Sequence, residues 1–185
     1  MRVTESIRPP AMGGPKRHRH TARWVAGAVA VVLAVVAVVA GTRPSAQATS
    51  VASPLIGHRA PSISAIDFGG RPASLGRDRG DFVFVNFFAS WCPPCASEEP
   101  NLLRFAFAHE KQSDVALLSV DIDDSTSGAR QFVTRWGLTW PAVPDHAGQF
   151  ASAFGVGSPP MTFLVDPSGT VVAAFAGPMT YRQLN

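Results

Sequence analysis

Cys92 and Cys95 are the residues of this 185-residue chain best suited to chemistry, and they are its only two cysteines. Two thiols at this spacing form a reversible disulfide or supply part of a metal site. A structural zinc site needs four ligands, and the sequence offers no second CxxC or nearby histidine pair. Covalent haem attachment needs histidine where the chain has Ala96. A purely structural disulfide is disfavoured because so short a loop constrains little of the unfolded chain.

The elements on either side of the cysteines favour a redox couple. Residues 82–88 are almost continuously apolar, which predicts a central strand covered on both faces. Residues 93–111 then predict a helix, so that Cys92 lies at its amino end. Free backbone N–H groups and the helix dipole favour an anion there, and a thiolate is the nucleophile of disulfide exchange. Cys95, one turn later, is expected to be less exposed and to resolve a mixed disulfide.

The remaining pattern predicts an α/β protein, a three-layer sandwich with a mixed sheet. Strands alternate with helices, and short hairpins stand at both ends. The expected elements are a hairpin of residues 63–67 and 72–75, a strand at 115–121, a helix at 127–136, a strand at 142–144, a helix at 149–154, a hairpin of 161–166 and 170–175, and a helix starting at Met179.

The basic character of the chain is confined to its first part. Residues 1–48 hold seven of the 16 basic residues and one of the 13 acidic ones. Nine basic and twelve acidic residues remain for residues 49–185, a net charge of −3. A phosphate-binding footprint is therefore missing from the globular part, and nucleic acid is not expected as a partner.

Residues 25–41 carry no charge and directly follow a basic segment. This stretch is longer than a usual signal-peptide core and shorter than the roughly 20 residues of a membrane-spanning helix. Trp24 favours an uncleaved anchor, whereas the small residues 46–48 favour secretion after cleavage near Ala48. Either way the positive-inside rule sends the following residues out of the cytoplasm. We expect a basic cytoplasmic tail (1–23), a transmembrane signal-anchor (24–41), a flexible linker (42–54) and an extracytoplasmic domain (55–185).

Two segments resemble a known family: residues 85–95, followed by Glu98 and Pro100, and residues 155–166. They are similar to the membrane-tethered thioredoxin-like proteins of the TlpA/ResA/CcmG (DsbE) type. The resemblance implies a thioredoxin-like fold with an added N-terminal β-hairpin. It also implies thiol:disulfide exchange on extracytoplasmic proteins, including reduction of apocytochrome c cysteines before haem attachment.

The resemblance also implies roles for individual residues. Cys92 matches the attacking cysteine and Cys95 the resolving one. Pro160 matches the cis-proline that lies beside the disulfide and helps to hold an extended substrate. Glu98 matches an acid near the active site, either partly buried with a raised pKa or, as the alternative, facing solvent in the first helical turns. Trp91 is expected to flank the disulfide as part of the substrate surface.

The chain departs from the family pattern at several positions. Asn86 stands where thioredoxins proper carry a buried aspartate, so proton transfer is left to Glu98 or to another group. Ala96 replaces a basic residue that is frequent after the second cysteine. Glu99 is expected to face solvent and to interact only with the helix dipole, and Pro100 is interpreted as structural.

The leading hypothesis is a membrane-anchored thiol:disulfide oxidoreductase that reduces extracytoplasmic proteins with cysteine pairs. A membrane thiol-disulfide electron carrier would restore its thiols, and neither a cofactor nor a metal is expected. A disulfide-forming oxidase of the same fold is one alternative. A Cu(I)-handling module for oxidase assembly, with Met161 as an added ligand, is another.

Overall fold

The computed structural model describes residues 19–41, 47–76, 80–111 and 114–185. The chain divides into two compact units, Met1–Ser45 and Ala46–Asn185. The first unit contains helix α1 (Arg19–Gly41), whose described side chains, Trp24 and residues 28–38, are exposed. Within the described residues, no helix combines the length and apolar character needed to cross a membrane. Most of the predicted basic tail (residues 1–18) and the start of the predicted linker (residues 42–46) lie outside the described residues.

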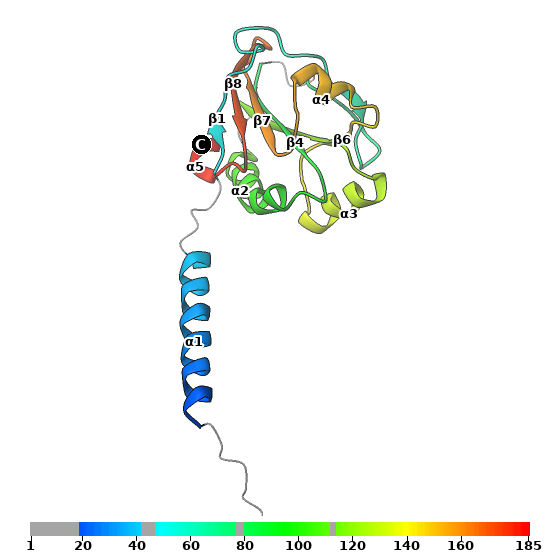
Figure 1. The fold of residues 1–185 in the computed structure, drawn as a ribbon. Coiled ribbons are helices and arrows are strands. Elements are labelled where there is room, and N and C mark those ends of the chain that lie inside the picture. The colour runs from blue at the N-terminus through cyan, green and yellow to red at the C-terminus, as the bar shows by residue number, and fades with distance from the viewer. Residues whose placement is uncertain (1–18, 42–46, 77–79, 112–113) are drawn as a thin grey trace, which may run out of the picture. The chain divides into compact units, whose positions relative to one another are not determined.

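The second unit is a thioredoxin-like α/β fold, as predicted (Figure 1). Its elements alternate along the chain in the expected order. They are β1 (Thr49–Ser50), β2 (Ser64–Ile66), β3 (Pro72–Ser74), β4 (Phe82–Phe88), α2 (Pro93–His109), β5 (Val115–Asp121), α3 (Thr126–Trp136), β6 (Ala142–Pro144), α4 (Gln149–Phe154), β7 (Met161–Val165), β8 (Val171–Ala176) and α5 (Tyr181–Leu184).

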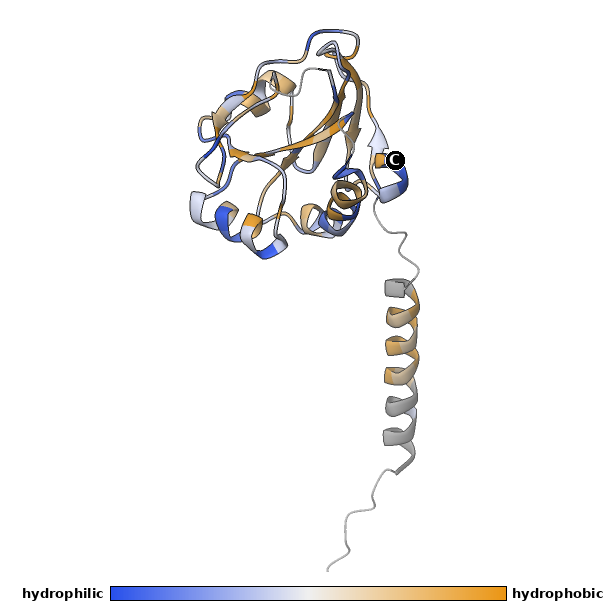
Figure 2. Cartoon of the chain, turned by 180° about the vertical axis from the view of Figure 1, so that it is seen from behind, coloured by the Kyte–Doolittle hydropathy of each residue, from blue (hydrophilic) through white to orange (hydrophobic). Residues whose placement is uncertain are grey.

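The main sheet is mixed, with the strand order β1-β8-β7-β4-β5-β6. Strands β4, β5 and β6 run parallel, whereas β7 pairs antiparallel with both β4 and β8. Strands β2 and β3 form the predicted N-terminal hairpin as a separate two-stranded sheet. The hydropathy colouring in Figure 2 shows the central strands as largely apolar, as expected for strands covered on both faces.

Alternate residues of β4 face opposite layers, because side chains on a strand alternate between its two faces. Phe84 packs with residues of α2 and α5, and Phe88 packs with Phe132 of α3. Val83, Val85 and Phe87 pack instead with the hairpin and with α4. Helices α2, α3 and α5 therefore cover one face of the sheet, and α4 with the hairpin covers the other (Figure 1).

Two predicted boundaries are wrong. The predicted linker extends to residue 54, but Ala48 is buried and Thr49–Ser50 pairs with Phe175 and Ala176 of β8. The folded unit therefore starts before residue 55, because this short segment completes the edge of the main sheet. The last helix begins at Tyr181 instead of Met179, and the Met179 N–H is used in a bond to another part of the fold.

Candidate active site

Cys92 and Cys95 form a disulfide at the amino end of α2, with Cα atoms 5.3 Å apart. Cys92 is the N-cap residue, and its Sγ accepts a hydrogen bond from the Cys95 N–H at 3.1 Å. Pro93 and Pro94 occupy the first two helical positions, where a missing N–H costs nothing. The Cys95 N–H is thus the first free donor of the helix, and it points at the sulfur that would carry the thiolate charge.

Both cysteines are buried in this disulfide form. Cys92 exposes 3% of its surface and Cys95 exposes none, so the second sulfur is the less accessible one, as predicted. They pack in an apolar cluster with Phe88, Ala129 and Phe132. Of the two cysteines, only Cys92 presents any surface to an incoming sulfur.

Glu98 is fully buried one helical turn after Cys95. Its Oε1 accepts a hydrogen bond from Asn86 Nδ2 at 2.8 Å, and its Oε2 accepts one from the Met179 N–H at 2.9 Å. Asn86 Nδ2 also donates to Thr162 Oγ1, two residues after Pro160. Burial raises the pKa of Glu98 to about 7, although the bonds from Met179 and Asn86 lower it. The buried alternative for Glu98 is therefore the one that the structure supports.

Glu99 does not face solvent, and that prediction is wrong. It is fully buried, and neither carboxyl oxygen has a hydrogen-bond partner within the described part of the chain. Burial, and secondarily the charge of Glu98, raise its pKa to about 8. Its backbone position four residues after Cys95 places it on the same side of α2 as that cysteine. Two buried carboxyl groups thus follow Cys95 by about one turn of α2.

The remaining predicted site residues lie at the same edge of the sheet as the disulfide. The Pro159–Pro160 peptide bond is cis, as predicted for Pro160. The residue after it, Met161, pairs with Phe87 near the end of β4, the strand that leads to Cys92. Trp91 is 56% exposed, and its Nε1 donates to the Asp123 carbonyl oxygen at 2.8 Å, which fixes the ring beside the CxxC loop.

The copper hypothesis gains no ligand set from the structure. Met161 is half-buried and packs against the core cluster on the α4 face. Among the described residues, no three His, Cys, Asp or Glu side chains group into a set that could hold a metal ion.

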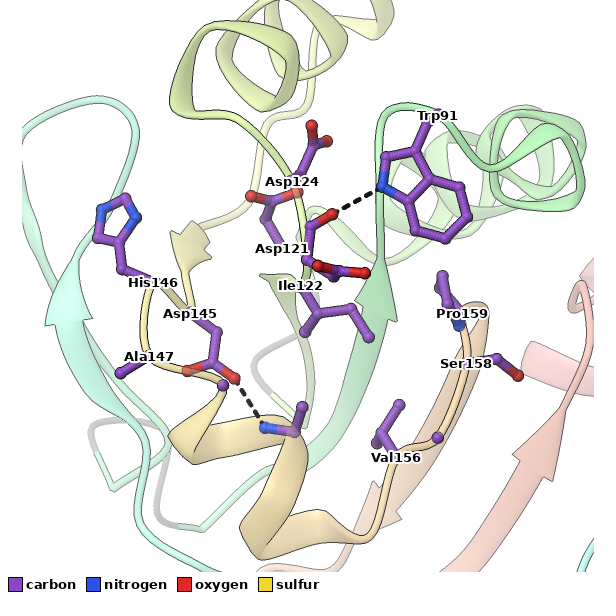
Figure 3. Close-up of a pocket in the computed structure, with 14 residues that line it drawn as sticks. Trp91, Asp121, Ile122, Asp124, Asp145, His146, Ala147, Val156, Ser158 and Pro159 are labelled. Atoms are coloured by element: carbon purple, nitrogen blue, oxygen red, sulfur yellow. Dashed lines mark hydrogen bonds between the residues drawn. The ribbon is translucent and has the colours of Figure 1, made fainter.

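A cleft of about 580 Å³ adjoins the site, and sequence reasoning missed it (Figure 3). Its walls come from Trp91, residues 121–124, residues 145–148, Ala151 and residues 156–159. We call it the acidic cleft, because four of its lining residues are aspartates. Asp121 is 96% buried (4% exposed), and burial, followed by the charge and hydrogen bonding of Asp124 and the charge of Asp145, raises its pKa to about 8. The acidic sequence directly after a buried strand was the available signal.

A CxxC disulfide at the amino end of the first helix of a thioredoxin-like fold, opposite a cis-proline, defines a thiol:disulfide oxidoreductase. The comparisons with known proteins agree. Residues 55–184 match the Redoxin family, and the chain belongs to that family, among proteins of the TlpA/ResA/CcmG type.

Relatives and solved structures narrow the assignment to this type. The chain is 36% identical over 129 residues to the thiol-disulfide oxidoreductase ResA of Geobacillus thermodenitrificans, covering 70% of this chain and 74% of the relative. It is 34% identical over 154 residues to the ResA of Geobacillus kaustophilus, covering 83% and 86%. The crystal structure of StoA from Bacillus subtilis superposes with a TM-score of 0.61 at 27% identity, covering 71% of this chain and 96% of StoA.

Proposed function

We propose that the protein reduces disulfides in extracytoplasmic proteins. The Cys92 thiolate attacks a substrate disulfide, forms a mixed disulfide and displaces one substrate thiolate. The Cys95 thiolate then attacks Cys92 Sγ, which forms the Cys92–Cys95 bond and releases the second substrate thiolate. Two electrons pass to the substrate, and the two protons of the enzyme thiols end on the substrate thiols. A thiol donor of the membrane then reduces the enzyme again.

The observation that carries the reductive direction is the burial of two carboxyl groups about one turn after Cys95 on α2. A thiol:disulfide protein is a strong oxidant when its reduced, thiolate form is stabilised. Here Glu98 and Glu99 follow Cys95 by three and four residues on α2, and the burial that raises the pKa of both carboxyl groups also disfavours a thiolate at the buried Cys95. Ala96 also supplies no positive charge. These features favour the disulfide form of the protein over its dithiol form. A protein of this kind gives up electrons readily from its dithiol form and therefore acts as a reductant.

The reduction potential tests this direction. Equilibration of the protein with defined dithiol buffers, read by mass after thiol alkylation, is expected to give a value near or below the roughly −270 mV of thioredoxin. A value near −120 mV, that of a strong oxidant, would reverse the assignment and make the protein a disulfide-forming oxidase.

Glu98 is proposed to accept the proton of Cys95 during resolution. With its pKa at about 7, it is the buried carboxyl group that changes charge at neutral pH and also holds defined bonds.

Replacing Glu98 with glutamine should lower the exchange rate by about 10²-fold and remove the rise in rate through pH 7. Stopped-flow rates between pH 5 and 9 measure both. Glu110→Gln, an exposed change at the end of α2, serves as the control, and a Glu98→Gln profile that still rises through pH 7 would exclude this role.

The location is part of the same proposal. Basic residues precede the uncharged residues 25–41, and the described apolar side chains of α1, including Val32 and Leu33, are exposed. We expect the chain to be held in the cytoplasmic membrane with the folded unit outside, where apocytochrome c is a candidate substrate. Alkaline extraction of membranes, with protease treatment of spheroplasts, tests both points. Full release into the soluble fraction would favour cleavage near Ala48.

A further inference from the structure

The acidic cleft has one carboxyl group whose bonding is incomplete. Asp124 accepts hydrogen bonds from the Ser90 and Ser125 N–H groups, each at 2.6 Å. Asp145 accepts from the Phe150 and Ala151 N–H groups at 3.1 and 2.8 Å. The Oδ1 atom of Asp121 is buried and has no partner among the described residues. A buried carboxyl oxygen without a donor is costly, so this atom marks a place for a ligand that donates.

The charge of the cleft indicates what that ligand is. Asp121, Asp123, Asp124 and Asp145 all line it, and the described lining residues include no lysine or arginine. The carboxyl groups of Asp121 and Asp124 lie beside each other (Figure 3), so a cation between them would relieve their repulsion. Because the described side chains form no metal-binding set, an organic cation fits the cleft better than a metal ion.

The walls of the cleft suit a long basic side chain. Ile122 and Val156 line it together with the aspartates (Figure 3). Lysine and arginine place their aliphatic stems along apolar surface and present the charged end to polar groups. A guanidinium or ammonium group at Asp121 would supply the missing donor while its stem contacts these two residues.

The position of the cleft connects it to the exchange reaction. Trp91 is the residue before Cys92, and Pro159 is the residue before the cis-proline Pro160, and both line the cleft. Consecutive Cα atoms are about 3.8 Å apart across a trans peptide bond and about 2.9 Å apart across a cis one, so the cleft begins one residue from each side of the reacting centre. A protein chain attacked by Cys92 would therefore have a side chain near its cysteine within reach of the cleft.

We propose that the acidic cleft binds a lysine or arginine side chain of the protein substrate, next to the cysteine that Cys92 attacks, and that Asp121 determines this preference. The inference rests on the exchange activity, and it holds for either direction of electron flow. It gives the enzyme a substrate class: proteins whose cysteine pair is followed or preceded by a basic residue.

The test uses the reduced full-length protein and three peptides that share one disulfide and carry lysine, glutamine or glutamate beside it. The wild-type protein is expected to reduce the lysine peptide with a kcat/KM about tenfold higher than the glutamine peptide, because a hydrogen bond to a charged group is stronger than one to a neutral group. The Asp121→Asn variant should lose most of this ratio. Each ratio compares two peptides reduced by the same protein. A substitution that slows the reduction of every peptide equally therefore leaves the ratio unchanged.

Asp114→Asn is the matched control, since Asp114 is exposed directly before β5 and Asp121 is the last residue of that strand. This control should keep both the ratio and the rate. A ratio near one in the wild-type protein, or a ratio unchanged in Asp121→Asn, would overturn the inference. Failure of the wild-type protein to reduce any of the peptides would instead count against the exchange function itself.

A second measurement needs no variant at Asp121. Peptides with both cysteines replaced by serine cannot react, and they report binding alone. The serine peptide with lysine should inhibit wild-type exchange at about tenfold lower concentration than the one with glutamine. Equal inhibition by the two peptides would contradict the proposed site even if Asp121→Asn did not fold.

Discussion

Replacing Cys95 with alanine is expected to stop turnover and to leave substrate proteins covalently attached to Cys92. The first attack needs only the Cys92 thiolate at the N-cap of α2, where the N–H at position 95 still points at the sulfur. Release needs a second thiol, and Cys95 holds the only other one in the chain. Multiple-turnover reduction should therefore fall to the uncatalysed background, while mixed disulfides accumulate.

Cys92→Ala is the matched control for this experiment. It keeps one cysteine of the same pair, but that cysteine exposes no surface, so no incoming sulfur can reach it. Non-reducing gels of envelope proteins, followed by mass spectrometry, should show trapped partners for Cys95→Ala and few for Cys92→Ala. Equal trapping by both variants would assign the attack to the wrong cysteine. Trapping by neither would argue against a substrate-exchanging enzyme.

The fold was predictable because most of its elements are specified by local patterns. The apolar run at residues 82–88 became β4 with the predicted bounds, and the helix before Gly137 ends there because Gly137 adopts the left-handed conformation (φ 65°). Strand β1 was missed for the opposite reason. Thr49–Ser50 is too short and too polar to show a period, and its pairing with Phe175 and Ala176 depends on contacts far along the chain.

The structure contains the expected disulfide and cis bond and the buried alternative for Glu98, and it overturns the expected solvent exposure of Glu99. The CxxC spacing with its neighbouring elements favoured a redox pair, and the family resemblance implied the cis bond at Pro160. Whether Glu98 and Glu99 are buried depends on which elements pack against α2, and the sequence does not show this packing. In the structure Met179, before the last helix, bonds Glu98 from a position 81 residues away. Glutamates are mostly exposed in proteins, so residue type alone predicts solvent exposure for two adjacent glutamates. In this fold tertiary packing buries both.

The acidic cleft was hidden for a related reason. Its aspartates are ordinary loop residues when each is considered in its own segment. Register brings Asp121 opposite Phe88 at the end of two parallel strands, which is also the edge that carries the CxxC loop. A charged residue at the carboxyl end of a strand in such a sheet is a stronger indication of a site than its local sequence suggests.

The second large effect is expected in the stability of the fold, through Glu99. Its pKa rises from the ordinary 4.5 to about 8 in the folded protein, mainly because of burial. The folded state therefore binds more protons than the unfolded state between these two values, and the free energy of unfolding must fall as pH rises from about 4.5 to 8. Below pH 4.5 Glu99 is protonated in both the folded and the unfolded state, so it no longer lowers the free energy of unfolding.

Glu99→Gln should remove this contribution while preserving size and shape. The variant is expected to resemble the wild-type protein at pH 5 and to be more stable at pH 8.5 by a few kcal/mol, since one unit of pKa shift corresponds to about 1.4 kcal/mol. Urea unfolding of the oxidised full chain at a series of pH values measures the difference. Glu98 and Asp121, whose pKa values are also raised, should leave a smaller slope in the variant.

Glu110→Gln provides the comparison for the same change on the same helix, because Glu110 is exposed at the carboxyl end of α2. Its stability curve should follow that of the wild-type protein at every pH. Parallel curves for Glu99→Gln and the wild-type protein would mean that Glu99 gains solvent or a hydrogen-bond donor in solution. Glu99 would then be ionised at neutral pH, contrary to the raised pKa that burial gives it in the folded structure.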